Sequence, residues 1–192
     1  KVTIVPRGQS LGAAWYLPQE RQITTKDQLL DQMCSLLGGR AAEELVFGEI
    51  STGAQNDLER ATKQAYAMVS IFGMSEKVGM LSYYDSTGRS DFSFTKPYSE
   101  KTAELIDEEA QAMIAAAYER AKRILAEHRE EHRQVAELLI EKEVIFSDDL
   151  ERILGKRPWS DEEEQQEAPD APEAPEETES AANDSINTEN RE

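Results

Sequence analysis

The chain has 192 residues, of which 39 are acidic and 21 basic, so its formal net charge at pH 7 is −18. Phosphate groups repel a protein with this balance, which argues against binding to nucleic acid or to anionic lipid. The sequence contains no run of 18 or more apolar residues, the length that a membrane-spanning helix needs. Its single cysteine, Cys34, excludes an internal disulfide. Because the chain begins at Lys1 rather than at methionine, we expect it to be a piece of a longer protein.

The negative charge is concentrated at the C-terminal end of the chain. Residues 160–192 include 13 acidic residues, one basic residue and three prolines that would interrupt a helix. Such a segment cannot bury enough apolar surface to offset the entropy lost on ordering. We therefore predict a disordered acidic tail over residues 159–192, either a solubilising appendage or a docking tail, and a folded portion over residues 1–158.

The first residues carry the only strand signal that we find. Residues 2–5 are β-branched and end at the turn Pro6-Arg7-Gly8, and a second apolar stretch runs over residues 11–17 and stops at Pro18. This pattern predicts a short β-hairpin over residues 2–17.

The remainder of residues 1–158 has helical patterning. Thr25-Lys26-Asp27-Gln28 has the form of a capping box, and Ser51 and Ser99 are further candidate N-caps. Apolar residues then recur at intervals of three and four. We expect helices over about residues 25–47, 53–72, 99–127, 133–142 and 147–154. The predicted fold class is mainly α, a helical domain with a small N-terminal β-hairpin and an acidic tail.

Three details of this pattern are open to a structural check. Gly38 and Gly39 cost the first helix about 1 kcal/mol each relative to alanine, which indicates either a helix break or the close approach of another helix. The apolar stripe of the first helix includes Leu45, and that of the second ends at Phe72. Residues 74–98 are rich in Gly, Ser and Tyr and predict a surface loop.

The only two histidines form the pattern H-x-x-E-H at residues 128–132. This is the inverted zinc-protease motif, in which a continuous helix places both imidazoles on one face. The helix of a catalytic zinc site is normally packed among apolar residues, whereas His128 and His132 have mostly charged and polar neighbours. We therefore favour two exposed histidines at a helix junction over zinc ligation.

Asp57 is a second candidate metal ligand. It lies in the first turns of the helix expected over residues 53–72, about 65° from the centre of the apolar stripe. The positive end of the helix dipole favours its ionised form, and an ionised carboxylate on a rigid helix suits an oxygen ligand of zinc. Acidic residues also favour helix N-termini for the dipole alone, so periodicity leaves both interpretations open.

Other kinds of site are not supported by the sequence. The segments beginning at Gly8 and Gly38 lack the spacing that cradles phosphates, so no ATP site can be placed on this chain. Cys34 lies on an apolar helix face, where a buried thiol is the ordinary interpretation.

Three ordered motifs resemble the protease domain of FtsH-type ATP-dependent zinc metalloproteases. They read K-V-T-I-V-P-R-G at residues 1–8 with L-G at residues 11–12, G-G-R-A-A-E-E at residues 38–44, and S-T-G-A-Q-N-D-L at residues 51–58. The resemblance covers about residues 1–158. It implies a membrane-anchored AAA+ homohexamer that unfolds protein substrates with ATP and degrades membrane and short-lived cytoplasmic proteins at a zinc site. It also implies the bacterial inner membrane, with the protease domain in the cytoplasm.

Carried over by position, the resemblance implies that Asp57 supplies the third zinc ligand. The two histidine ligands and the catalytic glutamate of the family come from an H-E-x-x-H helix upstream of the first motif, and this chain contains no H-E-x-x-H. We therefore expect no catalytic residue here, and expect ATP to bind on an ATPase module that this chain lacks. Glu43 and Glu44 are implied to lie near the active-site helix, where one could hydrogen-bond a zinc-bound histidine; otherwise they are ordinary charges on a helix flank. They are also the next candidate ligands after Asp57.

The leading hypothesis is thus a fragment of an FtsH-type protease that is inactive by itself, since one aspartate holds zinc poorly in competition with water. The hairpin is a candidate edge for pairing with an extended substrate. Two alternatives remain. One is a non-catalytic helical interaction protein with an acidic tail, and the other is a self-contained peptidase that uses His128 and His132.

Overall fold

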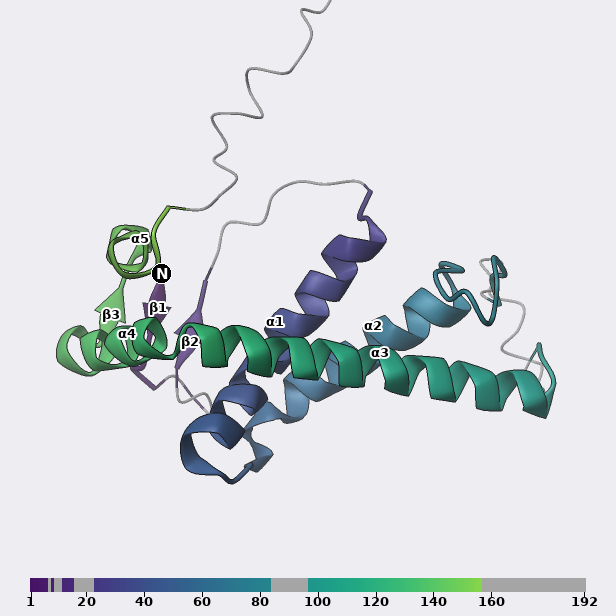
Figure 1. The fold of residues 1–192 in the computed structure, drawn as a ribbon, viewed down its shortest axis with the longest axis horizontal. Helices are drawn as coiled ribbons and strands as arrows, with labels where there is room; N and C mark the ends of the chain where they lie inside the picture. Colours follow the sequence, from purple (N-terminus) through teal and green to yellow (C-terminus); the bar gives the residue numbers. More distant parts are fainter. Residues whose placement is uncertain (7, 9–11, 16–22, 84–96, 157–192) are drawn as a thin grey trace, which may run out of the picture. The chain divides into compact units, whose positions relative to one another are not determined.

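The computed structural model describes residues 1–6, 8, 12–15, 23–83 and 97–156. Its elements in chain order are β1 (Val2–Thr3), β2 (Ala13–Ala14), α1 (Lys26–Phe47), the 3₁₀ turn η1 (Thr52–Ala54), α2 (Gln55–Ser70), α3 (Glu100–Glu127), α4 (Arg129–Lys142), β3 (Val144–Ile145) and α5 (Ser147–Leu154). The predicted fold class, mainly α with a small N-terminal antiparallel strand pair, is confirmed (Figure 1).

Two expectations concern other parts of the chain. The acidic tail expected over residues 159–192 lies outside the described residues, as does the central part (84–96) of the loop expected over residues 74–98. Among the residues that are described, no helix has the length and apolar character needed to cross a membrane.

The helix ends are set by local hydrogen bonds that the sequence predicted. The Thr25 hydroxyl accepts a hydrogen bond from the backbone N–H of Gln28 at 3.3 Å, and the Gln28 side chain accepts one from the N–H of Thr25 at 3.0 Å. Ser99 caps α3 in the same way by accepting from the N–H of Thr102 at 3.3 Å. At the other end of α1, Gly48 adopts φ 71°, a left-handed conformation that glycine adopts without strain.

The core forms where α1, α2 and α3 pack against one another (Figure 1). Many of its buried side chains are alanines, and such small side chains allow the helix backbones to approach closely. Larger side chains fill the remaining space, and the residues of the main cluster are Met33, Leu37, Ala61, Ala65, Met68, Ala110 and Ala117.

The structure corrects several details of the helical pattern. α1 runs without a break through Gly38 and Gly39, and a Cβ at either position would meet nothing within 4 Å, so neither a helix break nor a close helix contact explains them. Leu45 follows the buried Ala41 by one turn, yet it is 39% exposed because it lies near the end of α1. Phe72 is 55% exposed because α2 ends at Ser70, two residues before it.

The small sheet has three strands in the order β2-β1-β3, one more than the expected hairpin. β3 pairs with β1, so that Val2 faces Ile145 and Thr3 faces Val144. The buried Thr3 hydroxyl strengthens this pairing by donating to the backbone carbonyl of Glu143 at 2.8 Å. β1 is therefore central, and within the described residues β2 is the only strand of the hairpin with an open edge; substrate pairing there stays a prediction.

Candidate functional site

Asp57 lies in the first turn of α2, directly after η1. Ser51 begins this segment as its N-cap, because its hydroxyl accepts a hydrogen bond from the backbone N–H of Gly53 at 3.2 Å. The local sequence thus presents a carboxylate on the end of a regular helix.

The Asp57 carboxylate is accessible and only weakly engaged. Its side chain is 43% exposed, and its one ion pair within the described part of the chain is with Arg60, at 3.9 Å between Oδ1 and Nη1, which is too long for a hydrogen bond. The Arg60 side chain is 56% exposed, and exposed ion pairs of this kind contribute little. No other described residue donates a hydrogen bond to Asp57, so its oxygens are available to an external ligand.

Glu43, on the last turns of α1, accepts hydrogen bonds from Ser51, which lies between α1 and α2. Its Oε1 accepts a hydrogen bond from the Ser51 hydroxyl at 2.6 Å, and its Oε2 accepts one from the Ser51 backbone N–H at 3.2 Å. These two bonds, the side-chain bond first, hold the pKa of Glu43 below its ordinary value.

Glu44, the next residue, is tied to a different element. Its carboxylate accepts a hydrogen bond from the Tyr118 hydroxyl on α3, and Lys122 Nζ lies 3.6 Å from Oε1. The bond from Tyr118 is the main cause that lowers the pKa of Glu44. Glu43 and Glu44 therefore bond to different parts of the fold. Both are committed to protein partners, whereas Asp57 is not.

Nothing in the sequence signalled these partners. Ser51 was recognised as an N-cap through its own helix, but its bonds to Glu43 form across the turn between α1 and α2. Tyr118 and Glu44 are 74 residues apart, and only the packing of α3 on α1 brings them together.

The contact between Tyr118 and Glu44 leads to a pH-dependence prediction. Burial, followed by the hydrogen bond to Glu44, raises the pKa of Tyr118 to about 12. The folded state favours the neutral phenol, so the stability contributed by Tyr118 is present below an ordinary tyrosine pKa of about 10 and is lost as pH rises from about 10 to about 12. We expect chemical unfolding of the wild-type chain to show a steeper fall in stability over this interval than Tyr118→Phe. Equal pH dependence in the two proteins would contradict the assigned contact.

The inverted zinc motif is not assembled by the structure. α3 ends at Glu127 and α4 begins at Arg129, with His128 at φ −108° and ψ 33° between them, so the two histidines do not share one continuous helix. The His128 side chain is 61% exposed, and its Nδ1 lies 3.9 Å from Glu131. The alternative that His128 and His132 form a self-contained zinc site is therefore not supported.

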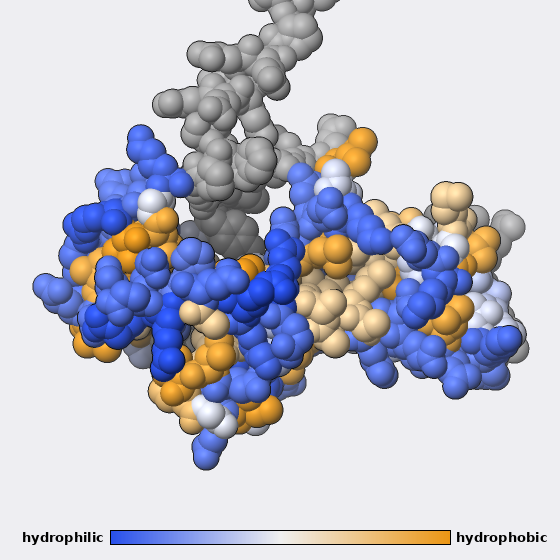
Figure 2. All heavy atoms as spheres, in the orientation of Figure 1, coloured by the Kyte–Doolittle hydropathy of each residue, from blue (hydrophilic) through white to orange (hydrophobic). Residues whose placement is uncertain are grey.

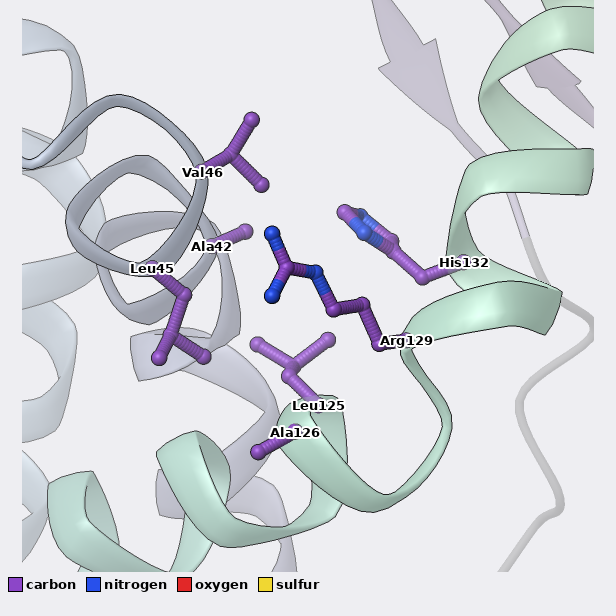
Figure 3. Close-up of a pocket in the computed structure, with 7 residues that line it drawn as sticks. All are labelled: Ala42, Leu45, Val46, Leu125, Ala126, Arg129 and His132. Carbon is purple, nitrogen blue, oxygen red and sulfur yellow. The ribbon is translucent and has the colours of Figure 1, made fainter.

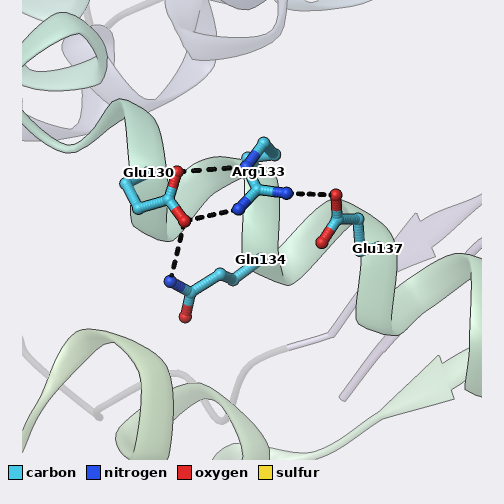
Figure 4. A network of polar contacts seen from close by, with 4 residues as sticks. All are labelled: Glu130, Arg133, Gln134 and Glu137. Atoms are coloured by element: carbon cyan, nitrogen blue, oxygen red, sulfur yellow. Dashed lines mark hydrogen bonds and ion pairs between the residues drawn. The ribbon is translucent and has the colours of Figure 1, made fainter.

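The charged residues around His132 form an ion-pair network along α4 instead (Figure 4). Arg133 donates from Nε and Nη2 to the two oxygens of Glu130 at 3.0 and 2.5 Å, and it also pairs with Glu137. Gln134 donates to Glu130 at 3.2 Å. These hydrogen bonds, that of Arg133 first, lower the pKa of Glu130 to about 2. The network is solvent-exposed, which fits a surface helix rather than a metal-binding one.

A shallow pocket lies between the ends of α1 and α3 and the start of α4 (Figure 3). Figure 3 shows the Arg129 guanidinium extending towards α1 and the His132 imidazole facing the same space. Its lining is mostly apolar: Ala42, Leu45, Val46, Leu125, Ala126, Arg129 and His132. Asp57, Glu43 and Glu44 do not line it, so the pocket is separate from the candidate ligand.

Exposed apolar side chains extend from Val46, in the pocket lining, past the end of α1. Val46 is 52% exposed, Phe47 75% and Ile50 62%. Figure 2 shows that apolar side chains also reach the surface at several places on the face in view, separated by hydrophilic ones.

The described residues do not complete a metal centre. Among them, no group of three or more His, Cys, Asp and Glu side chains could hold a metal ion. Cys34 is a buried free thiol, and burial is the main cause that raises its pKa, which does not favour the thiolate that binds metals. Of the three candidate ligands, only Asp57 has no close polar partner among the described residues, since Glu43 and Glu44 accept hydrogen bonds from Ser51 and Tyr118.

Comparison of the sequence with known protein families identifies the family of this chain. The model of Peptidase family M41 matches residues 1–153. This chain belongs to that family. The resemblance carried by the three motifs is thereby confirmed.

Named relatives of this family M41 chain come from bacteria and from mitochondria. The ATP-dependent zinc metalloprotease FtsH of Parabacteroides distasonis is 67% identical over 83% of this chain and 23% of its own length. The protein of the same name from Karelsulcia muelleri is 58% identical over 80% of this chain and 25% of its own length. The mitochondrial inner membrane m-AAA protease component of Mus musculus is 49% identical over 84% of this chain and 20% of its own length. The chain thus spans no more than about a quarter of these relatives.

Proposed function

We propose that this chain is part of the peptidase domain of an FtsH-type, ATP-dependent zinc metalloendopeptidase, and that Asp57 supplies one of the zinc ligands. The observation that carries the proposal is the accessible, uncommitted carboxylate of Asp57 in the first turn of α2. It lies in the region matched by the family model, and the bacterial relatives are named as zinc metalloproteases.

The neighbouring acids support Asp57 as the ligand. A catalytic zinc takes three protein ligands and lowers the pKa of a bound water towards neutrality. Glu43 and Glu44 already accept hydrogen bonds from Ser51 and Tyr118, so using either as a ligand would break an existing contact. Asp57 loses only a long ion pair with Arg60. The remaining ligands and the general base would come from an H-E-x-x-H segment outside this chain.

The other parts, the substrates and the location of the whole protein are proposed from its family membership. We place an ATPase module, the membrane anchor and the contacts of a homohexamer outside this chain, with residues 1–158 in the peptidase domain and residues 159–192 as an acidic tail. Proposed substrates are membrane and short-lived cytoplasmic proteins. The proposed location is the bacterial inner membrane, with the peptidase domain in the cytoplasm. The experiment that tests the proposal is replacement of Asp57 by alanine in the full-length protease, with ATP hydrolysis as the control.

By itself, the 192-residue chain is expected to bind zinc weakly and not to cleave protein substrates, since one carboxylate competes poorly with water for the metal. Zinc content after dialysis and casein cleavage measure both properties. The Asp57→Ala chain is the matched control and should give the same values as the wild type. One zinc per wild-type chain, or cleavage above the control, would mean that the chain holds a complete site.

A further inference from the structure

The turn between α1 and α2 is held by a two-point contact at Glu43. The two carboxylate oxygens of Glu43 accept from the hydroxyl and from the backbone N–H of Ser51, at 2.6 and 3.2 Å. The Ser51 hydroxyl in turn accepts from the N–H of Gly53 in η1. A continuous series of hydrogen bonds therefore runs from α1 into the segment that opens α2.

The two ends of this series differ in how firmly they are fixed. On α1, Ala41 is fully buried and Leu37 is 2% exposed, so the backbone that carries Glu43 is anchored in the core. Glu49, Ile50 and Ser51 are exposed, and Ala54 is the first buried residue after the turn. The residues of the turn are thus not held by apolar burial, although Leu58 in α2 packs against the core cluster, and the polar contact with Glu43 links the turn to the anchored helix.

Gly53 leaves room for this contact. A Cβ at position 53 would lie 3.3 Å from the Ser51 hydroxyl oxygen and 3.8 Å from Glu43 Oε1. A Cβ there would crowd the Ser51 hydroxyl, while its distance to Glu43 is an ordinary van der Waals contact. The absence of a side chain at Gly53 is therefore compatible with the contact between Glu43 and Ser51.

We propose that Glu43 is a positioning residue for the metal ligand Asp57: its two-point contact with Ser51 fixes the start of α2 and, through it, the carboxylate at position 57. This inference rests on the proposed function, because the position of Asp57 affects activity only if Asp57 binds the metal. Charge-assisted hydrogen bonds with two anchoring points restrict geometry more strongly than a single neutral bond. Contacts that orient metal ligands typically change metal affinity by about 10–100-fold.

The test uses the full-length protease and measures zinc affinity by competition with a chelator, together with kcat and KM for a protein substrate. Glu43→Ala and Ser51→Ala are each expected to weaken zinc binding by about 10-fold or more and to lower kcat. Because both variants break the same contact, the double variant should be no weaker than the weaker of the two single variants. Glu43→Gln keeps one acceptor oxygen and should recover part of the affinity.

The matched control is Glu59→Gln, which removes the same charge from an exposed acid on α2 that forms an ion pair with Lys63. Its zinc affinity should equal that of the wild type. ATP hydrolysis and hexamer formation report folding in every variant. If Glu43→Ala does not fold, Glu43→Gln and Ser51→Ala decide the question by the same zinc measurement.

Three outcomes separate this inference from the proposed function. If Asp57→Ala weakens zinc binding but Glu43→Ala does not, only the positioning role is rejected. The same holds if the effects of Glu43→Ala and Ser51→Ala add independently, since Glu43 would then act by another route. If Asp57→Ala leaves zinc affinity unchanged, the proposed function itself fails.

Discussion

Asp57→Ala in the full-length protease is expected to lower peptide-bond cleavage by at least about 100-fold while leaving ATP hydrolysis largely intact. Losing a residue that merely orients a metal ligand costs about 10–100-fold, so losing a ligand itself should cost no less. The stability of the fold should change little, because the Asp57 side chain is 43% exposed and its ion pair with Arg60 is long and exposed. Casein degradation and ATP turnover in the same preparation measure the first two effects, and bound zinc reports whether the ligand has been lost.

Asp148→Ala provides a matched control for Asp57→Ala. Asp148 is also an exposed aspartate in the first turn of a helix, α5, and so it shares the dipole environment. Its replacement should leave proteolysis and zinc content unchanged. Full proteolysis by Asp57→Ala with one zinc retained would reject Asp57 as a ligand and return Glu43 and Glu44 to consideration.

Leu37→Ala is expected to destabilise the folded chain by about 2–5 kcal/mol. Leu37 is 2% exposed and belongs to the cluster that joins α1, α2 and α3. Its neighbours include several alanines, whose short side chains cannot move to fill the space left by the missing atoms. The lost burial and the remaining cavity therefore add.

Urea unfolding of the two chains measures this difference directly. The same substitution at Leu154, which is 56% exposed on α5, is the matched control and should cost less than about 1 kcal/mol. Equal losses at both positions would mean that Leu37 is not in the packed interior.

The sequence predicted the helical elements well because their signals are local. The capping box at Thr25 and the N-cap at Ser99 depend on residues three positions away, and the structure has both. The recurrence of apolar residues at intervals of three and four likewise agrees with α2 and α3, on which several alanines at this spacing are buried. The errors lie where local patterns stop being informative, as at Phe72, which continues the spacing although α2 ends before it.

Contacts between distant segments were not predictable in the same way. β3 has only two residues, and its pairing with β1 joins positions more than 140 residues apart. His128 and His132 have the spacing of a zinc motif, but the break between α3 and α4 falls at His128. Spacing constrains side-chain direction only while the helix continues.

For the candidate site, the sequence by itself determined the identity of the ligand candidate and its place on α2, because motif and helix position are both properties of a short segment. Only the tertiary structure decided the roles of its acidic neighbours. Glu43 and Glu44 are adjacent on α1, yet one bonds to the turn before α2 and the other to α3. The physical reason is that neighbouring residues on a helix point about 100° apart, so their partners depend on which elements pack on each side.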